Sequence, residues 1–205
     1  LTLSEAVAAT FTHPNNLILE RIRRRPRPFG IPESEFHLLD GRVKMITKRP
    51  VRLLSLSMLD LHNRTSLWDV GFCTGSVSVE ARLQFPHLRV TAFEIRPGNC
   101  RRFGTPGITP VMGDFMEADT TDLPAPDAVF IGGHGGRLAD MLRKIDGVMR
   151  PGGVIVFNSV SEESRQLFTD GLAAIGRRIT ECVRLTVDAH NAIDVMKAAC
   201  GPRRI

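Results

Sequence analysis

Apolar and polar positions alternate along the chain in patterns that predict helices and strands in turn. Residues 48–61 (KRPVRLLSLSMLDL) repeat apolar side chains at three- and four-residue steps, which predicts an amphipathic helix. Thr47 is expected to cap this helix, with Pro50 accommodated in its first turn. Further helices are expected at residues 76–84, 136–149 and 162–176.

Short apolar runs between these helices predict strands at residues 66–71, 89–95, 108–114, 127–133 and 152–160. Two longer runs, 177–187 and 192–199, lie close enough in sequence to pair as a hairpin. Strands that alternate with helices form right-handed β-α-β units. The pattern therefore predicts an α/β fold with a seven-stranded, mostly parallel sheet and one antiparallel strand.

Residues 1–28 differ from the remainder of the chain. A short helical pattern at residues 4–11 and an apolar run, NLILERI, precede an Arg/Pro stretch at 23–28 that is typical of a stiff, exposed connector. We expect a boundary near Pro28, with the main domain at 29–205. The chain begins with Leu rather than Met, which favours a piece of a longer polypeptide.

Composition limits the classes of protein that remain. A chain of 205 residues with 42% hydrophobic residues suits one folded α/β domain. The apolar runs are too short to span a bilayer, and no signal peptide is visible; the scattered cysteines favour a reducing compartment, so a cytoplasmic location is expected. The scattered cysteines (Cys73, Cys100, Cys182 and Cys200) lack metal-site spacing, so neither disulfides nor a metal site is expected. A formal charge of +5, with Arg clusters, favours an anionic partner.

The residues that suggest chemistry follow the predicted strands, where open α/β sheets bind their ligands. They are Asp69, Gly71, Glu94, Asp114, Gly132, Gly133 and Asn158. This coincidence predicts one ligand site along the carboxyl edge of the sheet.

The stretch LWDVGFCTGSVSVE (67–80) places a glycine-bearing turn between a strand and a helix. Gly71 and Gly75 let a ligand approach the backbone at a helix N-terminus. The dinucleotide fingerprint GxGxxG is absent, and the loop instead suits S-adenosylmethionine (SAM) enzymes. Asp69 is interpreted as structural, holding the turn through backbone N–H groups; the alternative is contact with the amino group of the ligand. Cys73 is interpreted as a small apolar residue at a position where glycine is common.

Three further residues are candidates for contacting an adenosyl ligand. Glu94 ends the second strand, where a carboxylate accepts hydrogen bonds from ribose hydroxyls; the alternative is a solvated carboxylate. Asp114 either contacts an adenine amino group or caps a helix at residues 115–119. Phe115 either flanks the adenine ring or belongs to the core.

Several stretches in order resemble one family: GIPESEFH (30–37), ITKRPVRLLSLSML (46–59), the glycine turn (67–81), DAVFIGGHGGRL (127–138) and MRPGGVIVFNSVSEES (149–164). They resemble the decarboxylating precorrin-6B (or cobalt-precorrin-6B) carbon-15 methyltransferases of the corrin pathway to vitamin B12. The resemblance runs from about Gly30 to Pro202. The glycine turn alone marks only SAM methyltransferases in general.

The resemblance implies a Rossmann-like methyltransferase fold, bound SAM and a homotetramer. It also implies that residues 1–28 are the tail and linker of an upstream tetrapyrrole methylase in the same polypeptide. The family's SAM contacts map onto Thr47, Gly71, Phe72, Cys73, Thr74, Gly75, Glu94, Asp114 and Phe115. The chain departs from the family at Phe72-Cys73, where glycine or Ala-Gly is usual, and in the short segment 96–107, which leaves the adenine side more open.

The implied reaction is loss of carbon dioxide from the ring C acetate of an anionic tetrapyrrole, coupled to methyl transfer to carbon 15. The conjugated macrocycle serves as its own electron sink, and no Ser/His/Asp or Cys/His constellation points elsewhere. The expected acceptor loop comprises Gly132, Gly133, His134, Gly135, Gly136 and Arg137. His134 either pairs with a substrate carboxylate or moves a proton during loss of carbon dioxide. The alternative is that it is an exposed loop residue. Arg137 either clamps a carboxylate or only begins a helix.

Two other functions remain open at this level. The positive net charge favours a nucleic-acid methyltransferase. However, the loop after the fourth strand reads GGHGG and lacks the proline and aromatic residues that stack a flipped base. The chain has no Tyr and one Trp, so stacking platforms are scarce. A non-catalytic SAM-binding module is the other alternative, which turnover of a tetrapyrrole would exclude.

Overall fold

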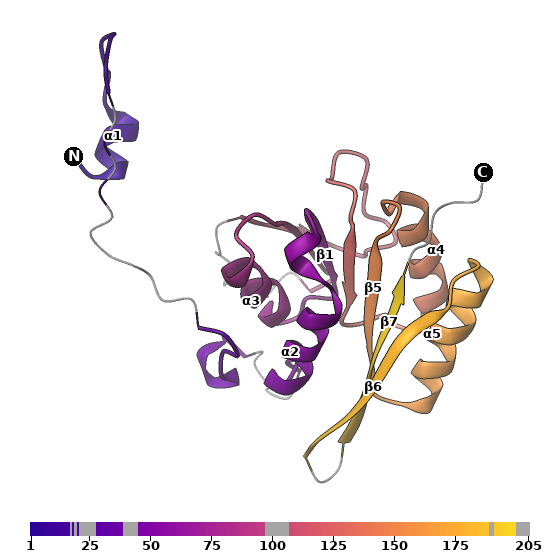
Figure 1. Ribbon diagram of the computed structural model, residues 1–205. Coiled ribbons are helices and arrows are strands. Elements are labelled where there is room, and N and C mark those ends of the chain that lie inside the picture. Colours follow the sequence, from indigo (N-terminus) through magenta and orange to yellow (C-terminus); the bar gives the residue numbers. More distant parts are fainter. Residues whose placement is uncertain are drawn as a thin grey trace.

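The computed structural model describes residues 1–16, 18, 20, 28–38, 45–96, 107–188 and 191–199. Its sheet has the strand order β3-β2-β1-β4-β5-β7-β6 (Figure 1). The strands are β1 (Ser66–Val70), β2 (Arg89–Glu94), β3 (Ile108–Met112), β4 (Ala128–Ile131), β5 (Val154–Ser159), β6 (Ile179–Asp188) and β7 (Asn191–Ala199). Among the described strands, β7 alone runs opposite to the other six, so the predicted α/β fold with one antiparallel strand is confirmed.

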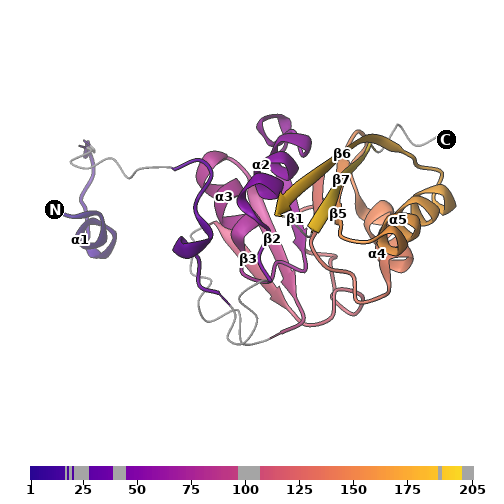
Figure 2. The same cartoon turned by 90° about the horizontal axis from the view of Figure 1, so that it is seen from below.

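The helices are α1 (Leu3–Ala8), α2 (Arg49–Met58), α3 (Ser76–Gln84), α4 (Leu138–Val148) and α5 (Glu162–Ala174), with short 3-10 turns at Glu33–Glu35 and Leu61–Asn63. The predicted helix at 76–84 is confirmed to the residue. The helix predicted at 48–61 ends earlier, at Met58. Figures 1 and 2 show α2 and α3 on one side of the sheet, and α4 and α5 on the other.

Thr47 is not the N-cap of α2, so that prediction was wrong. Lys48 occupies the N-cap position, with no side-chain capping hydrogen bond, and Pro50 lies in the first turn as expected. The carbonyl of Thr47 instead accepts a hydrogen bond from Arg52 Nη1 at 2.8 Å. The start of α2 is therefore set by a buried arginine rather than by a hydroxyl cap.

Two apolar clusters fill the faces of the sheet. One packs α4 and α5 onto the sheet and contains Trp68, Phe93 and Phe115; the other packs α2 and α3 and contains Leu59 and Phe130. The connection from β1 through α3 crosses one face of the sheet, and the connection from β4 through α4 crosses the other. Because β1 and β4 are neighbours, the direction of the connections reverses between these two strands. Open α/β sheets bind ligands at this reversal.

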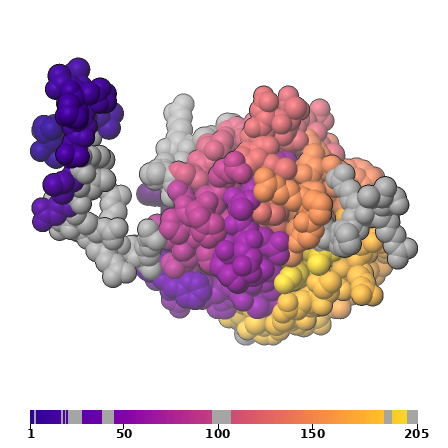
Figure 3. Space-filling view, turned by 45° about the horizontal axis from the view of Figure 1, so that its top comes forward, coloured from indigo at the N-terminus to yellow at the C-terminus, as the bar shows by residue number. Residues whose placement is uncertain are grey.

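The segment that carries α1 stands apart from the rest of the protein in Figure 3. Residues 23–27 of the expected connector, the Arg cluster at 100–102, and Cys100 and Cys200 lie outside the described residues. The boundary near Pro28 therefore stays a prediction. Within the described residues, no helix has the length and apolar character needed to cross a bilayer.

Candidate functional site

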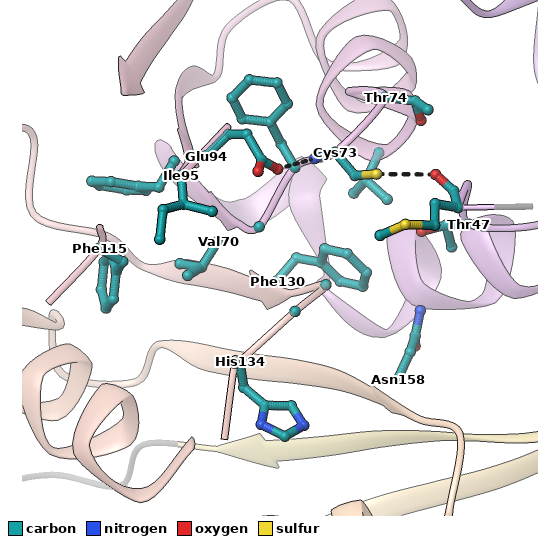
Figure 4. A pocket seen from close by; sticks show the side chains of 18 of the residues that line it. Thr47, Val70, Cys73, Thr74, Glu94, Ile95, Phe115, Phe130, His134 and Asn158 are labelled. Carbon is teal, nitrogen blue, oxygen red and sulfur yellow. Dashed lines mark hydrogen bonds between the residues drawn. The ribbon is translucent and has the colours of Figure 1, made fainter. Parts of the chain in front are cut away.

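A cavity of about 740 Å³ opens at the carboxyl ends of β1, β2 and β4. Most of the predicted site residues line it (Figure 4). They are Thr47, Gly71, Phe72, Cys73, Thr74, Glu94, Asp114, Phe115, Gly132, Gly133, His134, Gly135 and Arg137. Gly75 and Gly136 do not contribute to the wall. Asn158, the candidate that follows the fifth predicted strand, lines the cavity as well, so the sheet has gathered residues up to 111 positions apart, Thr47 and Asn158, around one space.

The glycine turn after β1 has the left-handed backbone that its composition suggests. Gly71, Cys73 and Gly75 have φ angles of +77°, +54° and +73°. Gly71 is also constrained by space, because a Cβ atom there would lie 2.9 Å from the backbone nitrogen of Gly133. The glycine at 71 thus lets the loops after β1 and β4 touch, which is a packing reason beside the expected approach of a ligand.

Glu94 lies at the end of β2 with 3% of its surface exposed. Its Oε2 accepts a hydrogen bond from the Cys73 N–H at 2.9 Å, and its Oε1 accepts one from the Arg96 N–H at 3.0 Å. Figure 4 shows the carboxylate directed toward the glycine turn. Glu94 therefore fixes the turn as well as presenting a carboxylate to the cavity, and it is not a solvated strand-end residue.

Cys73 is a non-glycine residue held in the left-handed region, with a φ angle of +54°. Its thiol donates a hydrogen bond to the Met45 carbonyl at 3.0 Å (Figure 4). Burial, reinforced by Glu94, raises the pKa of the thiol, which keeps it protonated and unreactive. The structural interpretation of Cys73 is therefore supported.

Asp69 is buried in β1 and acts on the helix that follows the turn. Its Oδ2 accepts hydrogen bonds from the Ser78 N–H at 3.2 Å and the Ser78 hydroxyl at 2.5 Å. Burial raises the pKa of its carboxyl to about 7. The expected structural role is confirmed, but the backbone N–H that it holds belongs to the first turn of α3 rather than to the glycine turn.

Asp114 starts a turn, and the helix predicted at 115–119 does not form. Its Oδ1 accepts hydrogen bonds from the Met116 N–H at 2.9 Å and from Arg137 Nη2 at 3.1 Å. Phe115 is 5% exposed and packs edge-on against Phe93, with ring centroids 5.0 Å apart. Phe115 is thus a core residue that also borders the cavity.

The loop after β4 carries His134 and Arg137 toward the cavity. The Gly136 N–H donates to His134 Nδ1 at 3.2 Å, so the proton of the neutral imidazole sits on Nε2. Burial lowers the pKa of His134, an effect that Glu163 opposes. Gly135 and Gly136 have φ angles of +52° and +82°, and a Cβ at Gly133 would meet no described atom within 4 Å. The open space beside Gly133 leaves room for a ligand.

The glycine turn also holds an unsatisfied polar atom. Thr74 Oγ1 is buried and has no hydrogen-bond partner among the described residues. Buried hydroxyls are nearly always paired in folded proteins, so this one indicates a partner supplied by a ligand or water. No group of three or more His, Cys, Asp or Glu side chains with the arrangement of a metal site occurs in the described part of the chain.

Other cavity residues were missed by sequence reasoning. They are Met45, Lys48, Ile95, Arg96, Val160, Val187, Ala192 and Ile193, among others. Ile95, Arg96 and Val160 immediately follow β2 and β5, so the strand-end rule would have found them. Val187, Ala192 and Ile193 come from the β6–β7 hairpin and carry no sequence signal, since only the sheet order brings the hairpin here.

Comparison with known proteins gives a consistent result. The family model of the precorrin methyltransferase domain matches residues 37–200. A cobalt-precorrin-6B C(15)-methyltransferase (decarboxylating) of Salmonella typhimurium strain LT2 is 40% identical over 158 residues, 74% of this chain and 81% of that protein. A precorrin-6Y C(5,15)-methyltransferase [decarboxylating] of Sinorhizobium sp. is 36% identical over 64% of this chain and 33% of its own length.

A solved structure agrees with these sequence matches. The precorrin-6Y C5,15-methyltransferase of Geobacter metallireducens GS-15 superimposes with a TM-score of 0.73 at 32% identity, covering 85% of this chain and 98% of that one. The family model spans the sheet, the glycine turn, Glu94 and the acceptor loop. The chain belongs to the precorrin methyltransferase domain family.

Proposed function

We propose that this domain methylates carbon 15 of a corrin-pathway tetrapyrrole with SAM and removes carbon dioxide from the ring C acetate, a reaction of cobalamin biosynthesis. Family membership and the 40% identical Salmonella relative support the reaction. The main support from this chain itself is that the glycine turn, Glu94 and the glycine-rich loop after β4 all line the same cavity. Its volume is in the ordinary range for ligand sites, about 300–1,000 Å³.

The described residues fit SAM. The left-handed turn leaves backbone N–H groups near a helix N-terminus, and Thr74 Oγ1 lacks a partner. We assign the turn at 71–75 and Thr47 to the methionine side, Glu94 to the ribose, and Asp114 with Phe115 to the adenine. When bound, SAM supplies an electrophilic methyl group.

The acceptor side is assigned to the loop Gly132–Arg137. Its glycines expose backbone N–H groups at the start of α4, which suits a substrate carboxylate. The neutral His134 offers an Nε2–H donor, whereas a proton at Nδ1 would oppose the Gly136 N–H. His134 therefore orients a carboxylate rather than delivering a proton. Arg137 keeps guanidinium donors beyond the one that Asp114 uses, which leaves it able to pair with a second carboxylate.

When carbon dioxide leaves, the electron pair of the broken C–C bond stays on the acetate carbon and is delocalised into the conjugated macrocycle. The protein therefore needs no strong base, and its contribution is mainly to hold the acceptor carbon in line with the methyl group. Apolar residues at the cavity rim, including Ile95 and Val160, are largely exposed and provide surface for the macrocycle.

We further propose that the domain acts in the cytoplasm as a homotetramer, behind a tetrapyrrole methylase in the same polypeptide. The bifunctional name of the Sinorhizobium relative, of which this chain matches one third, supports the fusion. Light scattering on the purified chain tests the tetramer; a monomer at all concentrations would contradict it.

Two experiments test the reaction and the cofactor assignment. Incubation with SAM and a precorrin-6B-type tetrapyrrole should give a product with one added methyl group and one carboxyl group lost, by mass spectrometry. Calorimetry with S-adenosylhomocysteine should show about tenfold or greater loss of affinity in Glu94→Gln, because one ribose hydrogen bond to a charged acceptor is weakened. The exposed Glu181→Gln serves as the matched control. Methylation of nucleic acid instead, or no turnover of the tetrapyrrole, would refute the proposal.

Gly133→Val provides a separate test of the acceptor loop. A Cβ atom there meets no described atom within 4 Å, and the Gly133 backbone is not in the left-handed region, so the valine side chain begins in open space beside the cavity. We expect turnover to fall while S-adenosylhomocysteine affinity stays within about twofold, since the cofactor is assigned to other loops. If turnover and S-adenosylhomocysteine affinity fell together, the proposal of a separate acceptor side would be contradicted.

A further inference from the structure

Lys144 on α4 makes three hydrogen bonds to one turn of the chain. Its Nζ donates to the carbonyls of Phe115, Met116 and Ala118 at 2.8, 3.0 and 2.7 Å. An ammonium group has three protons, so this turn uses every donor of the side chain. Lys144 is partly buried and does not line the cavity, so any effect on a ligand must pass through the turn.

The turn that Lys144 holds is the one that presents Asp114 and Phe115. Inside it, the Asp114 carbonyl accepts hydrogen bonds from the N–H groups of Glu117 and Ala118, both at 3.0 Å. The Lys144 Nζ also lies 5.1 Å from the centre of the Phe115 ring, a cation–π arrangement. Without the ammonium group, three partly buried carbonyls would lose their hydrogen-bond donor. The turn would then lose the contacts that hold its shape.

Arg137 secures the other end of the same turn. It lies seven residues before Lys144, which is two helical turns, so the two cations project from one side of α4. Arg137 Nη2 holds the Asp114 carboxylate while Lys144 holds the carbonyls beyond it. α4 thus determines both the backbone and the carboxylate direction at this corner of the cavity.

We propose that Lys144 is a positioning residue for the methyl donor, which sets the turn 114–118 so that Asp114 and Phe115 face the adenine. This inference rests on the proposed function, since it requires an adenosyl ligand at that corner. A lysine suits the task because its compact ammonium meets three converging carbonyls, which the planar guanidinium of arginine does not.

Calorimetry of the full chain with S-adenosylhomocysteine tests the inference. We expect Lys144→Met to weaken binding about tenfold, the equivalent of one hydrogen bond to Asp114 or more. Arg143→Met is the matched control, because Arg143 is the exposed neighbour on α4 and pairs with Asp140 at the surface. Its affinity should stay within about twofold of wild type.

A second ligand separates positioning from general loss of structure. S-inosylhomocysteine carries a carbonyl in place of the adenine amino group, so the Asp114 carboxylate should disfavour it in the wild type. Lys144→Met should reduce that preference for adenine, whereas a fold defect would weaken both ligands equally. Should Lys144→Met fail to fold, Lys144→Gln, which keeps an amide donor, carries the same comparison.

The outcomes distinguish this inference from the proposed function. Unchanged affinity and unchanged base preference in Lys144→Met, with tight binding by the wild type, would overturn the inference alone. Absence of S-adenosylhomocysteine binding by the wild type would overturn both.

Discussion

The Nε atom of Arg52 lies 2.6 Å from Oε2 of Glu80, and neither side chain has any exposed surface. The pair joins α2 to α3. Glu80 also accepts a hydrogen bond from the Gly30 N–H, and Arg52 donates to the carbonyls of Ile31 and Thr47. One buried ion pair thus ties the segment before α2, and the cavity residue Thr47, to the domain.

This relationship gives a physical account of two stretches that carry the family resemblance. GIPESEFH supplies Gly30, Ile31 and Phe36, whose ring lies 4.9 Å from the guanidinium carbon of Arg52. ITKRPVRLLSLSML supplies Thr47 and Arg52 themselves. Both stretches therefore converge on a structural centre, and the second also brings Thr47 to the cavity.

We expect Arg52→Met to destabilise the domain by about 3–5 kcal/mol, because it leaves the Glu80 carboxylate buried without its partner. Urea unfolding measures the effect. Removing both charges in Arg52→Met/Glu80→Met should cost less than the sum of the single changes. The exposed pair Arg143–Asp140 is the control, since its loss should cost under about 1 kcal/mol. Additive effects at Arg52 and Glu80 would contradict the account.

Gly71→Ala should destabilise the protein by at least about 1–2 kcal/mol through its left-handed backbone alone. The contact of the new Cβ with the Gly133 backbone adds to that cost and displaces both loops of the cavity. Gly133→Ala, on the opposite side of the same contact, is the control and should change stability by less than about 0.5 kcal/mol. Equal effects of the two variants in thermal unfolding would show that the loops do not meet as described.

Asp69 should make stability depend on pH. Its pKa is raised by burial to about 7, above the value near 3.9 of an unfolded chain. The folded state therefore binds the extra proton between these values, and the stabilising contribution is lost as pH rises from about 4 to about 7. As pH rises through this interval, the free energy of unfolding of Asp69→Asn should increase relative to that of the wild type by up to about 1.4 kcal/mol per pH unit. Above the interval, the difference between the two should stay constant. Parallel curves of unfolding free energy would contradict the burial of an ionisable group.

His134 should titrate below the ordinary range of histidine. Burial lowers its pKa, so the imidazole is neutral at physiological pH, as its contact with the Gly136 N–H requires. Nuclear magnetic resonance of the imidazole protons measures this directly. Because Glu163 opposes the shift, Glu163→Gln should lower the pKa further. A midpoint at or above about 6.5 would indicate a charged His134 and a different role.

Much of this protein followed from local sequence. Periodicity predicted the strands and helices because each depends on neighbours within a few residues, and the strand-end rule placed Gly71, Glu94, Asp114 and Gly132 at one edge. That rule works because parallel strands end on the same side of a sheet.

Tertiary structure alone decided which distant residues meet. Gly71 packs against Gly133, Arg52 pairs with Glu80, and Lys144 holds the carbonyl of Phe115, contacts that span 62, 28 and 29 residues. No local pattern distinguishes these residues from an ordinary loop glycine, a surface arginine or a helical lysine. Their partners are set by strand order and by helix packing across the sheet, which exist only once the chain has folded.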